Sequence, residues 1–225
     1  MNEAIIDKWQ RIFEMLLLKD TAVITDLLPG DDPKVELALA SSGFSGTLKA
    51  VDRSNEALSR LADYVGKVGA KYRFEAVNAD ILTDNLPQSD YIVGNHIIDD
   101  LLSYSFCQRE SLDPSKMRVD PHFSRQVWDA ICDSRQGHDL VRTAIENIVK
   151  SLKNGGVLIL SSYVSKFERE HRFEHETGFC RQLFDELRQY VTGRPYIIDW
   201  SGFLKASVQR DPKLNDQWIA IQRIN

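Results

Sequence analysis

Acidic and polar side chains follow four apolar stretches of this 225-residue sequence. Asp26, Asp52, Asp80 and Asn95 each lie at or just after the carboxyl end of a stretch with the composition of a buried strand. Carboxylate and amide oxygens accept hydrogen bonds, so this set suits a ligand with many hydroxyl and amino donors. The pattern predicts a small-molecule site wherever these four ends meet.

A Pro-Gly turn follows the first of these strands, between Asp26 and Pro33. Gly30 is free to adopt a positive φ, and we expect Asp32 to be the N-cap of a helix that begins at about Pro33. Asp31 and Asp32 disfavour a phosphate, because like charges ~4 Å apart repel by about 4 kcal/mol at an effective dielectric near 20. The turn therefore predicts a cationic ligand or a nucleoside without phosphate. Taken by themselves, these residues are explained equally well by a capped helix that binds no ligand.

Composition narrows the class of protein. The length suits one domain over residues 1–225, and the formal net charge is −5 with scattered basic residues, so a nucleic-acid partner is not expected. Residues 1–20 have the apolar spacing of an amphipathic helix and not of a signal peptide, and no stretch is long enough to span a membrane. The three cysteines have neither metal nor redox spacing. We expect reduced thiols and a cytoplasmic protein without a metal.

Segments whose apolar residues recur every two residues, as in strands, alternate along the chain with segments whose apolar residues recur every 3.6 residues, as in helices. The expected strands cover residues 21–28, 46–52, 72–77, 90–95, 157–163, 196–200 and 217–223, and the expected helices cover 33–42, 54–68, 139–152 and 165–191. Alternation with short connections predicts an α/β fold with a mostly parallel sheet and helices on both faces. Ligands of such sheets bind outside the carboxyl ends of the strands, where the strand order reverses.

The sequence resembles the class I S-adenosylmethionine-dependent methyltransferases from Thr21 onward. Residues 26–32 align with the acid-x-Gly-x-Gly-x-Gly motif of that family, with Gly30 retained and with Leu28 and Asp32 in place of glycines. Residues 153–159 resemble the Gly-Gly entry to the fifth strand, and the last two strands resemble the terminal hairpin of the family. The resemblance implies a Rossmann-like sheet of seven strands, mostly parallel, with an antiparallel C-terminal hairpin.

The resemblance also implies the cofactor and its contacts. Asp26 would meet the methionine amino group of S-adenosyl-L-methionine, Asp52 the ribose, and Asp80 with Ile81 the adenine. The full set of implied cofactor-binding residues is Asp26, Leu28, Pro29, Gly30, Asp52, Arg53, Asp80, Ile81, Asn95 and His96. The implied reaction is methyl transfer to a small-molecule acceptor.

Three residues after the fourth strand are candidates for catalysis. We expect one of His96, Asp99 and Asp100 to orient or deprotonate the acceptor, because they crowd one strand end. The alternative is that Asp99 or Asp100 caps a helix and that His96 is an ordinary polar residue.

Residues 103–137 interrupt the alternation, and we expect an irregular insertion with a short helix near 123–132 that serves as a lid over the acceptor. It offers side chains that stack on a flat molecule or pair with a carboxylate: Tyr104, Phe106, Arg109, Arg118, His122, Phe123, Arg125 and Trp128. A surface excursion with its own small apolar cluster is the alternative.

His171 and His175 have the i, i+4 spacing of metal ligands on one helix. Charges of both signs surround them, which favours an exposed helix laced with ion pairs.

Two other functions remain open at this stage. The lost glycines fit a binding or scaffold subunit without catalysis, and the same cofactor also supports transfer of its aminopropyl arm.

Overall fold

The computed structural model describes residues 3–30, 32–134, 136–195, 197–200, 202–204 and 216–224. Within these residues a seven-stranded sheet has the order β3-β2-β1-β4-β5-β7-β6. The strands are β1 (Val23–Leu27), β2 (Thr47–Asp52), β3 (Arg73–Asn78), β4 (Ser89–Asn95), β5 (Leu152–Ser162), β6 (Ile197–Asp199) and β7 (Gln217–Arg223). The first five are parallel, and β7 runs antiparallel between β5 and β6. The strand order reverses between β1 and β4, which creates a crevice at their carboxyl ends.

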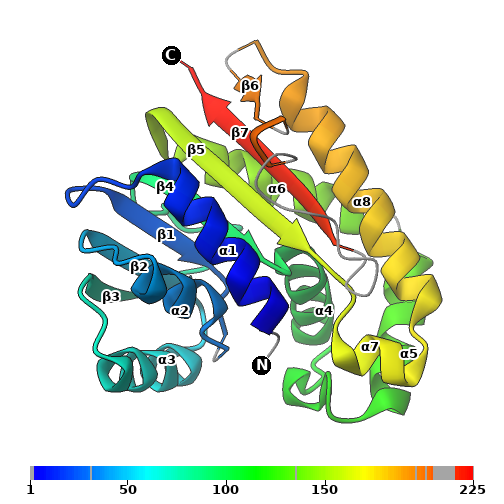
Figure 1. Ribbon diagram of the computed structural model, residues 1–225. Coiled ribbons are helices and arrows are strands. Elements are labelled where there is room, and N and C mark those ends of the chain that lie inside the picture. The colour runs from blue at the N-terminus through cyan, green and yellow to red at the C-terminus, as the bar shows by residue number, and fades with distance from the viewer. Residues whose placement is uncertain are drawn as a thin grey trace.

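Helices cover both faces of this sheet (Figure 1). Their bounds are α1 (Glu3–Leu16), α2 (Lys34–Ser41), α3 (Asn55–Val68), α4 (Ile97–Arg109), the 3-10 turn η1 (Pro114–Lys116), α5 (Pro121–Cys132), α6 (Gln136–Lys150), α7 (Lys166–His171) and α8 (Glu174–Thr192). α1, α2 and α3 lie on one face, and α4, α5, α6 and α8 lie on the other. Among the described residues, no helix is both long and apolar enough to cross a bilayer.

The two-sided cover explains the composition of the strands. In β5, Val157 and Ile159 pack under α1 and α2, whereas Leu158 and Leu160 pack under the helices of the opposite face. All four are nearly fully buried, and each such side chain contributes about 1.5–3 kcal/mol. The predicted Rossmann-like fold, with its antiparallel C-terminal hairpin, is confirmed.

The start of α2 differs from the prediction. The helix begins at Lys34, and Pro33 is its N-cap without any side-chain hydrogen bond. Asp32 does not cap the helix, because its carboxylate instead pairs with the ammonium group of Lys34. Asp31, the other acid expected in this turn, lies outside the described residues, as does Tyr196 at the expected start of the sixth strand.

Residues 103–137 are far more regular than expected. α4 continues to Arg109, because its apolar residues pack against α5 and α6. Asp120 caps α5 through its side chain, with Pro121 at the first helical position. The segment is therefore helical cover for the sheet, joined by the turn at η1.

The charged stretch 165–191 forms two helices and not one. The helix is interrupted at Arg172, which adopts a left-handed conformation with φ of 55°. The next residue, Phe173, is buried, and its ring packs against the ring of Phe167 in α7. His171 therefore ends α7, while His175 belongs to α8, so the shared helix face expected for a metal pair does not exist. No group of three or more metal-ligating side chains occurs within the described residues.

Candidate active site at the carboxyl ends of the strands

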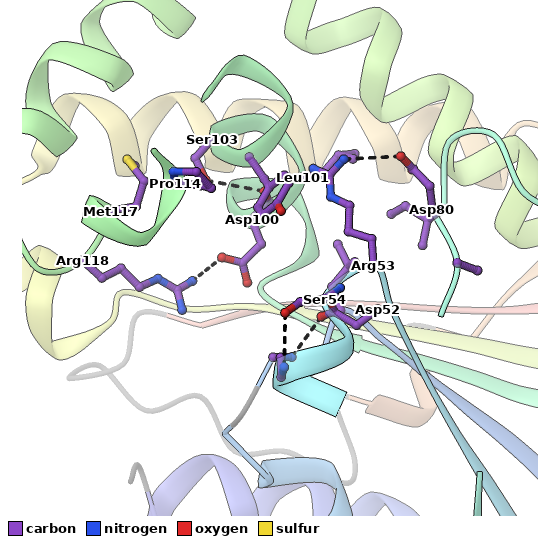
Figure 2. Close-up of a pocket in the computed structure, with 16 residues that line it drawn as sticks. Asp52, Arg53, Ser54, Asp80, Asp100, Leu101, Ser103, Pro114, Met117 and Arg118 are labelled. Carbon is purple, nitrogen blue, oxygen red and sulfur yellow. Dashed lines mark hydrogen bonds and ion pairs between the residues drawn. The ribbon is translucent and has the colours of Figure 1, made fainter. Parts of the chain in front are cut away.

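A cavity of about 310 Å³ opens where β1, β2 and β3 end and α4 begins (Figure 2). Seven residues predicted for the site line it: Leu28, Gly30, Asp52, Arg53, Asp80, Ile81 and Asp100. They come from four separate segments, at or just after the carboxyl ends of β1, β2, β3 and β4, which the parallel sheet brings to one edge. The volume lies at the lower end of the range for small-molecule pockets.

Asp52 connects the turn after β1 to the end of β2. Its Oδ1 accepts a hydrogen bond from the backbone N–H of Ser54 at 2.8 Å, and its Oδ2 accepts one from Gly30 at 3.3 Å. Gly30 has φ of +61°, and nothing lies within 4 Å of the position that a Cβ would occupy there. The turn is therefore held against the carboxylate and leaves open space beside its backbone. Leu28, which replaces a family glycine, also has a positive φ of 50° and adds its side chain to the cavity wall.

Arg53 and Asp80 form the opposite wall of the cavity. The guanidinium of Arg53 lies 3.3 Å from Asp80 Oδ2 (Figure 2). It also lies 3.6 Å from the ring centroid of Tyr104. The second oxygen of Asp80 accepts a hydrogen bond from the backbone N–H of Leu82 at 2.8 Å. These contacts hold a carboxylate and a flat cationic group next to apolar Ile81, an arrangement that suits a heteroaromatic ring with amino donors.

His96 begins α4 in a left-handed conformation, with φ of 64° and only 7% of its surface exposed. Its Nδ1 lies 3.0 and 3.1 Å from the two carboxylate oxygens of Asp99. Burial by itself lowers the pKa of His96, but the Asp99 carboxylate outweighs burial and the pKa is raised above 6.5. Its Nε2 is buried and has no hydrogen-bond partner among the described residues. An imidazole oriented through one nitrogen with the other unpaired has the arrangement of a general base.

Arg118, in the turn after η1, lies against the two acids that follow His96 in α4, Asp99 and Asp100. Its Nη2 lies 2.5 Å from Asp100 Oδ1 and 3.4 Å from Asp99 Oδ2. Burial raises the pKa of Asp100 to about 6 although Arg118 lies against it, whereas His96 and Arg118 overcome burial and lower the pKa of Asp99. Asp99 is thus the charged partner of His96. A smaller cavity of about 50 Å³ lies beyond Arg118, walled by Trp128, Phe167 and Phe173.

The insertion contributes fewer contacts than expected. Of its eight candidate side chains, Tyr104 and Arg118 line the large cavity, and Arg118 and Trp128 line the small one. The remaining five line neither of these two cavities: Phe106, Arg109, His122, Phe123 and Arg125. Arg125, for example, donates to the backbone carbonyl of His171 and thereby ties α5 to α7.

Five predicted site residues lie outside the large cavity: Asp26, Pro29, Asn95, His96 and Asp99. Asn95 is committed to the protein, because its Oδ1 accepts from Ser161 at 2.5 Å and from the Trp9 indole at 3.5 Å. Its amide donates to the Tyr163 hydroxyl at 3.5 Å, and that ring packs edge-on against His96 with 3.9 Å between centroids. Tyr163, at the end of the expected fifth strand and not predicted as a site residue, therefore supports the imidazole.

Asp26 lies in β1 with 2% exposure, beside the completely buried Glu36 of α2. The two carboxyl groups lie close enough for each to shift the pKa of the other, and neither Glu36 oxygen has a hydrogen-bond partner among the described residues. Burial and the neighbouring acid raise the pKa of Asp26 well above its usual range, and burial raises the pKa of Glu36 to about 7. Glu36 was missed in the sequence, although an acid between Val35 and Ala38 in an otherwise apolar helix was a usable signal.

Comparison with known proteins supports the fold. No family model matches the sequence, and no curated protein matches it. Among solved structures, an rRNA methylase from Streptococcus thermophilus is 15% identical with a TM-score of 0.52, covering 96% of this chain and 94% of its own. The plantazolicin methyltransferase BpumL, in complex with a monoazolic desmethylPZN analogue and SAH, is 13% identical with a TM-score of 0.53, over 98% of this chain and 82% of its own. The pyocyanin biosynthetic protein PhzM is 14% identical with a TM-score of 0.54, over 95% and 54%. The chain therefore has the class I methyltransferase fold.

Proposed function

We propose that this protein transfers the methyl group of S-adenosylmethionine to a small-molecule acceptor. The observation that carries the proposal is the cavity at the switch point of a methyltransferase fold, where Asp52 ends β2 and Asp80 lies two residues after β3. Nucleosides present ribose hydroxyls and an amino group, and each of these donors requires an acceptor at that edge.

The residues at this edge fit such a cofactor. Asp52 retains acceptor capacity toward the cavity, because each of its oxygens has two lone pairs and accepts one backbone N–H. Gly30 leaves open space where a ligand would lie against the backbone. Asp80 and Ile81 offer an acceptor and an apolar surface for the adenine.

When bound, S-adenosylmethionine supplies a methyl group already activated by its sulfonium. The chain has to hold the acceptor, exclude water and remove a proton if the acceptor carries one. In our proposal His96 Nε2 takes that proton, Asp99 holds the imidazole through Nδ1, and Arg118 keeps Asp99 ionised. Asp100 forms the wall between this cluster and the cofactor cavity.

A small acceptor fits the charge of the protein better than RNA does. The net charge is −5, and Asp99, Asp100 and Glu168 all face the region beyond Arg118. Nucleic-acid binders instead present clustered Lys and Arg to phosphates. The aromatic walls of the small cavity, whose volume is about 50 Å³, favour a small apolar group of the acceptor.

The test is calorimetric titration of the full chain with S-adenosylmethionine and S-adenosylhomocysteine, repeated on Asp52→Asn. We expect the variant to weaken binding by about 1–3 kcal/mol, the scale for loss of a buried hydrogen-bond partner. The matched control is Asp90→Asn, since Asp90 accepts from Val23 N at 2.8 Å at the opposite end of β1. Equal weakening by both variants would mean that Asp52 does not contact the cofactor.

Turnover then separates the rival functions. Incubation with candidate acceptors should yield S-adenosylhomocysteine, whereas methylthioadenosine would indicate aminopropyl transfer. Failure of the intact chain to bind either nucleoside would refute the proposed methyl-transfer function. It would favour a scaffold subunit in which the side chain of Leu28 blocks the cofactor from the turn after β1.

A further inference from the structure

The small cavity adjoins the large one at Arg118. Its volume is about 50 Å³, and it is lined by residues of α4, α5 and α7, of the turn after η1 and of the link between α7 and α8. At roughly 10–15 Å³ for each water-sized group, it has room for about four such groups. Figure 2 shows Arg118 and Met117 on the side of the large cavity away from Asp80. Four residues line both cavities: Asp100, Ser103, Met117 and Arg118.

The charges that line the small cavity are unequal. Three carboxylates, those of Asp99, Asp100 and Glu168, share it with a single guanidinium, that of Arg118. Arg118 Nη2 lies 2.5 Å from Asp100 Oδ1 and 3.4 Å from Asp99 Oδ2, so two acids already match its charge. The excess of negative charge favours a cationic ligand and repels a carboxylate or a phosphate.

Glu168 is the acid that the neighbouring cations leave unmatched. Its Oε2 accepts the backbone N–H of the N-cap residue of α7, and no cation of the described residues forms an ion pair with it. Lys166, in the same helix, pairs with Glu170 at 3.6 Å. Arg125 pairs with Glu176 at 3.8 Å and does not line the cavity.

Aromatic rings form another part of the wall. Trp128 and Phe173 are 7% and 2% exposed, and the Phe167 ring packs on Phe173 with 5.6 Å between centroids. Aromatic faces attract a cation, and they also pack against the methylene groups next to a charged nitrogen. Carboxylates and rings together are therefore complementary to an alkylammonium group. An alcohol of the same size carries no charge and gains less from this cavity.

The catalytic cluster of the proposed function reaches the same cavity through Asp99. This residue lines the cavity and holds the His96 imidazole, with 3.0 Å between Asp99 Oδ2 and His96 Nδ1. The imidazole is buried, and its Nε2 has no hydrogen-bond partner among the described residues. A buried acceptor of this kind requires a donor, and the N–H of an amine supplies one.

We infer that the small cavity binds an alkylammonium group and that the methyl acceptor is an amine. This inference rests on the proposed function and names the substrate class of that site. The amine gives one proton to His96 Nε2, from which it passes to the solvent. The lone pair that is freed on nitrogen forms the bond to the methyl carbon while the C–S bond breaks, and the electrons of that bond remain on sulfur. The positive charge ends on the methylated nitrogen, and the sulfur becomes neutral.

The experiment compares three probes of nearly equal size: propylammonium, 1-propanol and propionate. Each is titrated into the full ¹⁵N-labelled chain at pH 7.5 without a nucleoside, and the indole N–H resonance of Trp128 is followed by NMR. That resonance is identified by its absence from the spectrum of Trp128→Phe. At this pH the amine is protonated, and Asp100, with a pKa of about 6, is ionised.

We expect propylammonium to bind with a dissociation constant of about 1–10 mM, within the affinity that four non-hydrogen atoms can supply. Propanol should bind at least tenfold more weakly, and propionate should not bind. The same samples with S-adenosylmethionine should yield N-methylpropylamine and S-adenosylhomocysteine, which mass spectrometry detects.

Glu168→Gln tests the charge without removing the helix cap, because glutamine at this position also completes a capping box. We expect this variant to weaken propylammonium binding about tenfold. The matched control is Glu170→Gln, since Glu170 lies in the same short helix with 58% of its side chain exposed and does not line the cavity. The ¹⁵N spectra of both variants show directly whether they are folded.

The outcomes separate this inference from the proposed function. Equal binding of the three probes, or equal weakening by Glu168→Gln and Glu170→Gln, overturns the inference, and binding of S-adenosylmethionine then leaves the proposed function standing. Propylammonium bound by a chain that binds no nucleoside overturns the proposed function and leaves a cation site. A chain that binds both but forms no methylated amine overturns the amine as acceptor.

Discussion

Replacement of Glu36 by Gln should make the protein more stable at alkaline pH. The pKa of this buried carboxyl is about 7, against 4.5 for an exposed glutamate, so the folded state holds the proton more tightly than the unfolded state. Between these two values the folded chain binds more protons, and the free energy of unfolding falls as the pH rises. The difference of about 2.5 pH units, at 1.36 kcal/mol each, corresponds to about 3 kcal/mol lost by pH 8.

Gln cannot ionise, so the variant escapes this loss. We expect Glu36→Gln to be about 1–3 kcal/mol more stable than the wild type at pH 8, and equal or slightly less stable at pH 5, where both side chains are neutral. Urea unfolding followed by circular dichroism, at intervals of half a pH unit from 5 to 8.5, measures the difference. Titrating groups that do not interact with Glu36 are common to both proteins and cancel, whereas Asp26, whose pKa is raised in part by Glu36, contributes to the measured difference.

The reasoning fails if the two stability curves run parallel across this range. A parallel offset would mean that Glu36 ionises as easily in the folded chain as in the unfolded one, and that it shares no proton with Asp26. Glu176→Gln, which replaces a buried carboxyl in α8 beside Arg125, provides the control for loss of a buried acid elsewhere in the fold.

Three further predictions concern other parts of the molecule. Asp99→Asn should lower the maximal methyl-transfer rate and move the rise of activity with pH to lower pH, because the carboxylate that raises the pKa of His96 is lost; an unmoved profile would exclude His96 as the base. Lys8→Met should cost about 2–3 kcal/mol in chemical unfolding, because it removes the cation 2.6 Å from the Asp216 carboxylate, whose side chain is 1% exposed and keeps the Trp218 indole as a donor. A smaller loss for Lys8→Met/Asp216→Asn would confirm coupling. Gly156→Ala should cost about 1–3 kcal/mol in the same assay, since the added Cβ would lie 2.8 Å from one main-chain carbonyl oxygen and 3.1 Å from another. A neutral result would mean that the backbone around Gly156, in the first half of β5, is easily displaced.

Several features of the fold followed from local sequence alone. The apolar run of β5 indicates burial on both faces because a parallel sheet needs cover on each side, and this needs no knowledge of partners. Asp52 and Asp80 were predicted as cavity residues because parallel strands present their carboxyl ends at one edge. These inferences depend on periodicity and chain direction, which are properties of short segments.

The contacts that give the site its chemistry depended on the tertiary structure. The sequence placed Asp32 as a cap, but the ion pair with Lys34 took its carboxylate. Only packing brings Arg118 to Asp99, or Glu36 across the turn to Asp26, because such contacts depend on how helices lie on the sheet. Periodicity indicates which face of an element is buried but not which side chain it meets there, so the charge state of the buried groups is decided by the folded structure.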